Sequence, residues 1–417
     1  MSETNDTPPG APADTGAAMR LLKEAFELEE QGHYGPALDK ALAALEGFGE
    51  DRTGAAASLH LAGVLNVHLG RHEQAAEQLE AAVPLRVSTG DLEGLASLHQ
   101  QRLELALSRR DLSLAERAAA DLLAVHSQGG DKAGESSARH QLAQILLAEG
   151  HAEQALSHVE RGLELSAGAG EEPVHVGFLL LACRVEQSRG MQGRAEQISL
   201  QAVSLARRVG KRAVLVDALL QRSVFVPGEE GRALLEEALD GTELLRDLPR
   251  RAVLLGRLAQ VEAGLGKHRA AVDRLRYQAR TWGDLGNRED QLEALHAASS
   301  MAESAGEAAL ALQVAKELVE ACKIARHPGA LAAATFLLGH RQLAIGDLNA
   351  AAAAFRASAH VQPLPEARGV ALAMLGQVLV AAGLPGALRA LQSARGLLAG
   401  TDQAAQIDEL IAEVEAS

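Results

Sequence analysis

The stretch that decides the fold runs from Leu61 to Ala82 and reads LAGVLNVHLGRHEQAAEQLEAA. An apolar helical run ends at Gly70, and a second helical run follows it. Gly63 stands seven residues before Gly70, and Ala75 stands five residues after it. A glycine at the turn can adopt a positive φ and end the first helix, and small residues let two helices approach closely. The stretch therefore predicts two antiparallel helices that cross near Gly63 and Ala75.

The same three marks recur along the chain, mostly every 40 residues. The turn residues are Gly32, Gly70, Arg110, Gly150, Gly190, Gly266, Gly306, Gly346 and Gly383. Five residues after each turn stand Ala37, Ala75, Ala115, Ala155, Ala195, Ala271, Ala311, Ala351 and Leu388. Seven residues before each turn stand Ala25, Gly63, Leu103, Ala143, Cys183, Ala259, Ser299, Gly339 and Gly376. One gap of 76 residues holds two repeats, and the sequence at 227–231 predicts an irregular pair there.

This periodicity predicts an all-α protein in which about ten helix pairs stack into an α-solenoid, with about 21 helices and no strands. A single pair cannot bury its apolar surface, but stacked pairs bury it continuously. Residues 1–16 lack the pattern and are rich in proline, so we expect a disordered tail. We expect the superhelical domain over 17–400 and a polar capping helix over 401–417.

The pattern in Leu61–Ala82 resembles the consensus of the tetratricopeptide repeat family. The family's repeat is 34 residues long, so a period near 40 indicates a longer second helix or inter-repeat loop. The segments Val87–Asp91 and Trp282–Asn287 resemble the long repeats of kinesin light chains and of the sensor regions of MalT-like regulators. The resemblance covers residues 17–400. It implies a right-handed superhelix in which the first helix of each pair lines a concave groove that holds peptides.

The residues six and ten positions before each turn are expected to face that groove, and many of them are polar. Glutamine is frequent among them, and its amide suits hydrogen bonding to a peptide backbone. The predicted peptide-binding residues are His60, His99, Glu104, His140, Gln144, Arg184, Asp217, Gln221, Gln260, His296, His340 and Gln377. We place the centre of the site at His140, Gln144, Arg184, Asp217, Gln221 and Gln260. Two alternatives stay open. The groove is solvated and binds no ligand, or Arg184 and Asp217 only neutralise each other.

The groove pattern also limits the ligand. The predicted groove lacks aromatic anchors and lacks the lysines and asparagines that grip a terminal carboxylate. The predicted ligand is therefore an internal peptide segment or a helix of a partner protein.

The charge is unevenly distributed along the chain. Residues 1–200 hold 16 Lys and Arg against 30 Asp and Glu, whereas residues 201–417 hold 24 against 25. The net charge of −15 disfavours nucleic acid as a partner, because phosphates repel an acidic surface. It favours either simple solubility or a partner with a basic surface.

No motif for catalysis, a cofactor or a metal is present in the sequence, so we expect a protein that binds rather than an enzyme. His68 and His72 have metal-like spacing, but the turn at Gly70 separates them. Cys183 and Cys322 lie in different repeats, which favours a reducing, cytoplasmic location. The weakly apolar stretch Gly369–Leu388 contains a turn and predicts a buried helix pair rather than a membrane span.

The leading hypothesis is a cytoplasmic adaptor or scaffold that binds a peptide segment in its groove. A second hypothesis is a ligand- or peptide-sensing regulator that acts on a partner in trans. A third is a structural protein that associates with itself. The sequence leaves all three open.

Overall fold

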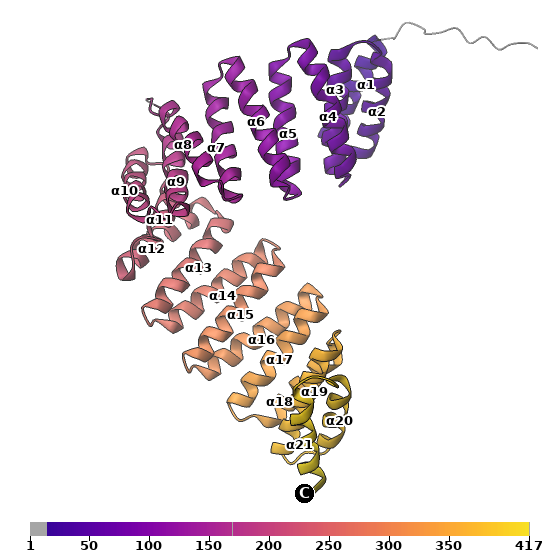
Figure 1. Cartoon of the computed structure of the whole chain (residues 1–417), viewed down its shortest axis with the longest axis vertical. Coiled ribbons are helices and arrows are strands. Elements are labelled where there is room, and N and C mark those ends of the chain that lie inside the picture. The colour runs from indigo at the N-terminus through magenta and orange to yellow at the C-terminus, as the bar shows by residue number, and fades with distance from the viewer. Residues whose placement is uncertain (1–14, 169, 417) are drawn as a thin grey trace, which may run out of the picture. The chain divides into compact units, whose positions relative to one another are not determined.

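The computed structural model describes residues 15–168 and 170–416, and in this part of the chain every regular element is an α-helix (Figure 1). There are 21 helices in it and no strand, which confirms the predicted all-α class. The predicted disordered tail lies outside the described residues except for Thr15 and Gly16, which open the first helix.

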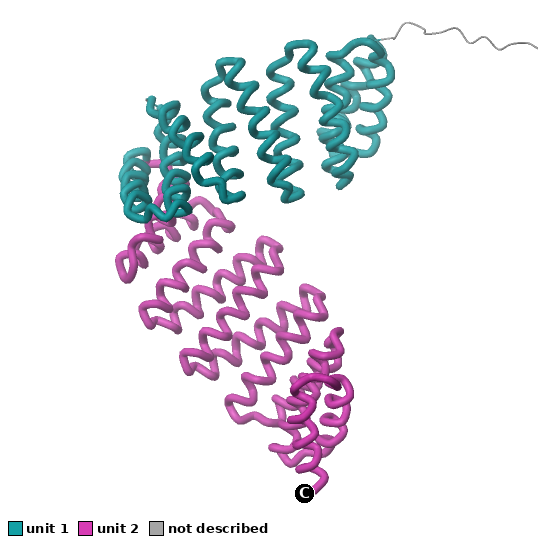
Figure 2. The backbone as a smooth tube through the Cα atoms, in the orientation of Figure 1, with its two compact units in different colours: residues 1–209 teal, residues 210–417 magenta. Residues whose placement is uncertain are grey.

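The chain divides into two compact units, residues 1–209 and 210–417 (Figure 2). The first unit contains α1 (Thr15–Glu30), α2 (Tyr34–Phe48), α3 (Arg52–His68), α4 (His72–Thr89), α5 (Leu92–Ser108), α6 (Leu112–Gly129), α7 (Lys132–Ala148), α8 (Ala152–Leu165), α9 (Glu172–Ser188) and α10 (Gln192–Val209). The second contains α11 (Arg212–Arg222), α12 (Gly228–Leu245), α13 (Leu248–Gly264), α14 (His268–Asp284), α15 (Arg288–Ser304), α16 (Ala308–Ala325), α17 (Pro328–Ala344), α18 (Leu348–Val361), α19 (Pro365–Ala381), α20 (Ala387–Leu397) and α21 (Gln403–Ala416).

Within each unit, every helix packs against the next one along the chain, as in an α-solenoid of tetratricopeptide-like pairs. We call the odd-numbered helices up to α19 the A helices and the even-numbered ones the B helices. All nine predicted turn residues have a positive φ, between 57° at Arg110 and 84° at Gly150. The turns therefore end the A helices as the sequence predicts.

The small residues mark the helix crossings. The eight alanines five residues after the turns are all 0% exposed. Across the crossing, the Cys183 thiol donates a hydrogen bond to the carbonyl oxygen of Ala195 at 3.3 Å. The Ser299 hydroxyl donates likewise to the carbonyl of Ala311 at 3.1 Å. A side chain larger than these would push the two backbones apart.

The last pair departs from the predicted spacing. Leu388 is only half-buried, and the buried small residue is Ala387, one position earlier. The turn here contains Pro385 and two glycines with positive φ, Gly383 and Gly386, and α20 begins directly after Gly386. The shift follows from this different turn.

The longer repeat comes from the second helix. Most B helices have 17 or 18 residues, and short turns join them to the next A helix. These second turns also contain residues with positive φ, including Gly90, Gly130, Gly286, Arg246 and Arg326. A 40-residue repeat is therefore two helices of nearly equal length, each closed by a left-handed residue.

The irregular pair lies where the sequence predicts it. Helix α11 has only 11 residues, and α12 begins at Gly228. A β-carbon on Gly231 would stand 1.9 Å from the carbonyl oxygen of Val226, so only glycine allows the chain to turn back this tightly.

The C-terminal segment forms one more helix. Helix α21 packs on α20 and buries Ala404 and Ile407. The stretch Gly369–Leu388 folds into α19, a turn and the start of α20, as predicted. No helix in the described part of the chain combines the length and the hydropathy that a membrane span requires.

Candidate functional site

The positions six and ten residues before each turn lie on the A helices, turned by about 60–100° around the helix from the crossing residue. Most of their side chains are half-buried or exposed, whereas the alanines at the crossings are fully buried; Leu22 is the buried exception. We call this surface the A-helix face. The structure describes it separately in each unit.

In the first unit, His60 lies beside Arg86 on the A-helix face. The Nη2 atom of Arg86 stands 3.4 Å from Nδ1 of His60, and Arg86 also forms an ion pair with Asp91. Burial, together with the neighbouring guanidinium, lowers the pKa of His60 to about 4. The imidazole is therefore neutral at physiological pH and cannot serve there as a cationic anchor.

His140 lines a hollow of about 440 Å³ between α7 and α9. Its ring meets Phe178 edge to face, with the ring centres 5.3 Å apart. The buried Ser136 Oγ and Gln141 Oε1 atoms have no hydrogen-bond partner, and both residues line the same hollow. Burial lowers the pKa of His140, and the nearby Arg184 cation adds to this effect. The hollow thus offers neutral hydrogen-bonding groups beside an aromatic ring.

The remaining predicted residues of the first unit differ in exposure and in hydrogen-bond partners. Gln144 and Arg184 are exposed on the A-helix face, and Glu104 accepts a hydrogen bond from Gln100 Nε2 at 2.9 Å. His99 is only 5% exposed and lies 2.9 Å from Arg102 Nη1, on the side of α6. Each helical residue is turned about 100° from the previous one, so His99 turns away from the groove positions. His99 does not join the predicted set.

In the second unit, Asp217 already has a partner. Arg250 donates two hydrogen bonds to its carboxylate, at 2.7 and 3.1 Å, and also pairs with Asp247. Within its own unit, Asp217 is thus neutralised by Arg250 of α13, and the pairing with Arg184 of the first unit stays a prediction. Asp217 serves to join α11 and α13, which makes it a weaker candidate for a basic ligand.

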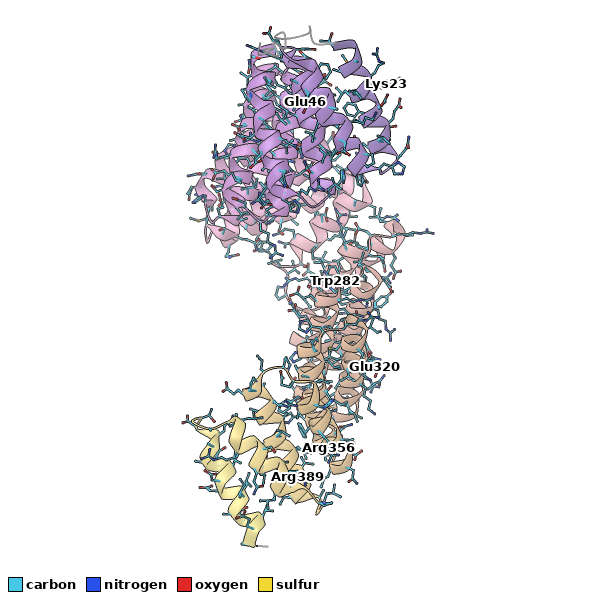
Figure 3. The ribbon with its side chains drawn as sticks, turned by 90° about the vertical axis from the view of Figure 1, so that its right-hand side faces the viewer. Lys23, Glu46, Trp282, Glu320, Arg356 and Arg389 are labelled. Carbon is cyan, nitrogen blue, oxygen red and sulfur yellow. The ribbon has the colours of Figure 1, made fainter. Side chains whose placement is uncertain are left out.

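A second hollow, of about 350 Å³, lies between α13 and α15 with α14 as its floor. Two positions expected in the groove, Gly256 and Gln260, line one wall. Trp282, which is labelled in Figure 3, and Gln278 come from α14, and Glu293 comes from α15. We call this the Trp282 hollow. The lining combines an aromatic ring with amides and carboxylates.

Trp282 is not among the residues predicted from the sequence, because it lies on a B helix. Its position follows a rule that the sequence does contain. Arg86, His126 and Trp282 each precede the N-cap residue of the next A helix by five positions. The backbone N–H of that N-cap residue donates to the carbonyl of the earlier residue, as for Asn287 and Trp282 at 3.0 Å. This turn brings the end of a B helix to the A-helix face.

A cluster of aromatic rings lies further along the second unit. Phe336 and His340 of α17 contact the buried Phe355 of α18, with ring centres 5.3 and 5.2 Å from it. Burial lowers the pKa of His340. Together with Trp282, this cluster corrects the expectation that the groove lacks aromatic anchors.

The other predicted residues of this unit are Gln221, Gln260, His296 and Gln377. Gln221 is half-buried, and the other three are exposed. Gln260 accepts a hydrogen bond from Arg257 Nη1 at 2.8 Å. Part of the predicted centre of the site lies in the first unit and part lies in the second. Each unit therefore has its own candidate residues.

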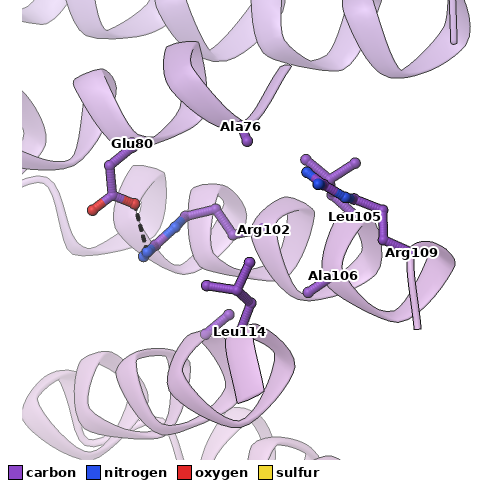
Figure 4. A pocket seen from close by; sticks show the side chains of 8 residues that line it. Ala76, Glu80, Arg102, Leu105, Ala106, Arg109 and Leu114 are labelled. Atoms are coloured by element: carbon purple, nitrogen blue, oxygen red, sulfur yellow. Dashed lines mark ion pairs between the residues drawn. The ribbon is translucent and has the colours of Figure 1, made fainter. Parts of the chain in front are cut away.

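The B-helix side offers a different kind of hollow (Figure 4). Leu105, Ala106 and Leu114 line a space of only about 90 Å³, and the Glu80–Arg102 ion pair, at 2.6 Å, lies beside it. This space is below the usual size of a ligand pocket. No group of three or more His, Cys, Asp or Glu side chains suited to a metal occurs among the described residues.

Neither a protein-family model nor a curated protein matches the chain. Among solved structures, kinesin light chain repeats from Podosopora anserina are 16% identical over 48% of this chain and all of theirs, with a TM-score of 0.40. Aspartyl phosphate phosphatase F from Bacillus subtilis is 11% identical over 86% of this chain and 97% of its own, with a TM-score of 0.48.

A signal transduction ATPase with a tetratricopeptide repeat sensor from Pyrococcus horikoshii is 12% identical. The match covers 92% of this chain and 55% of that one, with a TM-score of 0.47. Solved repeat proteins of tetratricopeptide type are thus structural neighbours of this chain, and the likeness concerns the fold alone.

Proposed function

We propose that this protein is a non-catalytic binding protein that holds a peptide segment of a partner against its A-helix face. The observation that carries the proposal is the Trp282 hollow. A single large aromatic side chain lies in a recess of the surface that the repeat exposes, with hydrogen-bonding groups around it. Aromatic anchors in such recesses dominate the energetics of many protein interfaces.

The polar lining supports a peptide as the ligand. Gln260 and Gln278 each offer donors and an acceptor, which suits the alternating N–H and C=O groups of an extended chain. Gly256 leaves room for this, because a β-carbon there would stand 2.7 Å from the Gln278 amide nitrogen. The recess is wide enough for one or two side chains rather than for a folded domain.

A selection from a random peptide library displayed on phage tests the proposal. The full chain is immobilised, and the enriched peptides are synthesised and titrated by calorimetry. We expect Trp282→Ala to weaken their binding by tenfold or more, about 1.4 kcal/mol. Tyr277→Ala is the matched control, since Tyr277 is an aromatic residue of the same helix that stacks under Arg251 outside the hollow.

Circular dichroism first verifies that both variants keep the helical content of the parent chain. Equal loss of affinity in both variants, or no loss in either, places the ligand outside the hollow. A library from which no peptide is enriched contradicts the proposed function itself.

A further inference from the structure

The chemistry of the Trp282 hollow selects one kind of side chain. Asp290 and Glu293 are its charged lining residues, and no lysine or arginine lines it. The Trp282 side chain, from α14, lines the floor of the hollow between α13 and α15. An aromatic face beside carboxylates attracts a cation, because the negative potential of the ring face and the charge of the carboxylates both favour a positive group.

Two arginines on the helices that line the hollow have other hydrogen-bond partners. Arg257 donates to the amide oxygen of Gln260, and Arg288 donates to that of Gln291. Asp290 accepts a hydrogen bond from the Asn287 amide at 2.5 Å, and no ion pair joins it or Glu293 to a described lysine or arginine. The site therefore keeps net negative charge within a recess.

Resting on the proposed function, we propose that the Trp282 hollow binds an arginine side chain of the peptide ligand. A guanidinium is planar and stacks on an indole, and its five donors match the two carboxylates together with the Gln260 and Gln278 oxygens. A lysine ammonium is a compact, strongly hydrated charge and uses fewer of these acceptors. Arginine thus fits the hollow better than lysine.

The chain contains one tryptophan, so its fluorescence reports directly on this hollow. The full chain is titrated with three blocked pentapeptides, acetyl-Ala-Ala-X-Ala-Ala-amide, in which X is arginine, lysine or citrulline. Citrulline has nearly the shape of arginine but no charge. We expect a saturable fluorescence change with the arginine peptide, a weaker one with lysine, and at least tenfold weaker binding with citrulline.

Glu293→Gln is the variant that removes charge from the hollow, and we expect at least fivefold weaker binding of the arginine peptide. Glu320→Gln is its control, because Glu320 is exposed on α16 and pairs with Lys323. The control variant should bind as the parent chain does.

Equal response to arginine and citrulline overturns the assignment, and so does the absence of a saturable response up to about 5 mM peptide, where binding would be weaker than about 3 kcal/mol. A failure of the arginine assignment can be distinguished from a failure of the proposed binding function. Enriched library peptides that bind through Trp282 without containing arginine contradict only the arginine assignment. The absence of any enriched peptide contradicts the binding function.

Discussion

At the scale of the residue, the clearest agreement between sequence and structure is Arg110. It stands where eight other repeats have glycine, and the period alone predicted a turn there. The structure gives it φ of 57°, in the left-handed region that costs a non-glycine residue roughly 1–2 kcal/mol. The flanking helices thus determine where the turn forms, and the type of residue at the turn affects only the stability of the protein.

Replacing Arg110 by glycine should therefore stabilise the protein. We expect the free energy of unfolding to rise by about 1 kcal/mol, because glycine adopts a positive φ without strain. Urea denaturation followed by circular dichroism measures the change. Arg109→Gly is the matched control: Arg109 has φ of −85°, so glycine there should stabilise nothing and lower the stability by up to about 1 kcal/mol. Stabilisation by both changes would contradict the account.

Other residues show which features of the structure could not be predicted from the sequence. The crossing alanines could be predicted because they recur at one spacing and serve one packing role. Trp282 could not be found in this way, since its equivalents are Arg86 and His126 and share no chemistry with it. Asp217 was correctly expected on the A helix, but its partner Arg250 lies 33 residues away and depends on how two repeats stack.

At the scale of the element, the helix pair is the unit that the sequence predicts best. The apolar period and the turn residues predict both helices of a pair, and the distorted loop at 227–231 marks the pair that contains the short α11. The sequence does not determine the length of the B helices, because a longer helix and a longer loop give the same period. The structure settles this with a second left-handed residue at the end of most B helices.

The crossing between α7 and α8 should tolerate no larger side chain. Ala155 is 0% exposed there, so Ala155→Phe must separate the two helices. We expect a loss of about 1–3 kcal/mol or more of unfolding free energy, measured by urea denaturation. Glu153→Phe on the same helix is a control, since Glu153 is exposed. A urea midpoint of the Ala155→Phe variant equal to that of the wild type would contradict the predicted close approach of α7 and α8.

The irregular pair gives a second test at this scale. Gly231→Ala places a methyl group against the Val226 carbonyl oxygen, and neither backbone can move without displacing α12. We expect a lower melting temperature, whereas Gly193→Ala, which meets no atom within 4 Å, should leave it unchanged or raise it. Equal melting temperatures for the two variants would show that the tight turn at 226–231 is not formed.

At the scale of the whole molecule, buried and half-buried histidines should make stability depend on pH. Five of them have a lowered pKa, with burial as the main cause: His60, His99, His140, His158 and His340. Their folded pKa lies below the unfolded value of about 6.5, so the unfolded chain takes up protons first as the pH falls. Stability should be constant above pH 7 and should decline from about pH 6.5 downward.

His60 should contribute the steepest part of this decline. Its pKa of about 4 corresponds to about 3 kcal/mol at most between pH 6.5 and 4. His60→Gln should therefore flatten the plot of unfolding free energy against pH in this window, as measured by denaturation at a series of pH values. An unchanged slope would mean that His60 is hydrated rather than buried beside Arg86.

Charge acts across the molecule as well. The first 200 residues contain nearly twice as many acidic as basic residues, and the Trp282 hollow is acidic within a nearly neutral half. Binding of an arginine peptide should therefore weaken as salt rises beyond about 0.15 M, where the screening length falls below about 8 Å. Affinity independent of salt in the titration would indicate that charge plays no part in recognition and that the acidic composition serves solubility.

The most direct measurement of the central claim is photo-crosslinking of a selected peptide from defined positions of the chain. A photoreactive phenylalanine analogue is placed at Ala297, which lines the Trp282 hollow, or at Glu320, which is exposed elsewhere on the same unit. A peptide bound in the Trp282 hollow should crosslink from position 297 and not from position 320, and Trp282→Ala should abolish the product. Crosslinking from position 320 but not from 297 would contradict binding at the A-helix face.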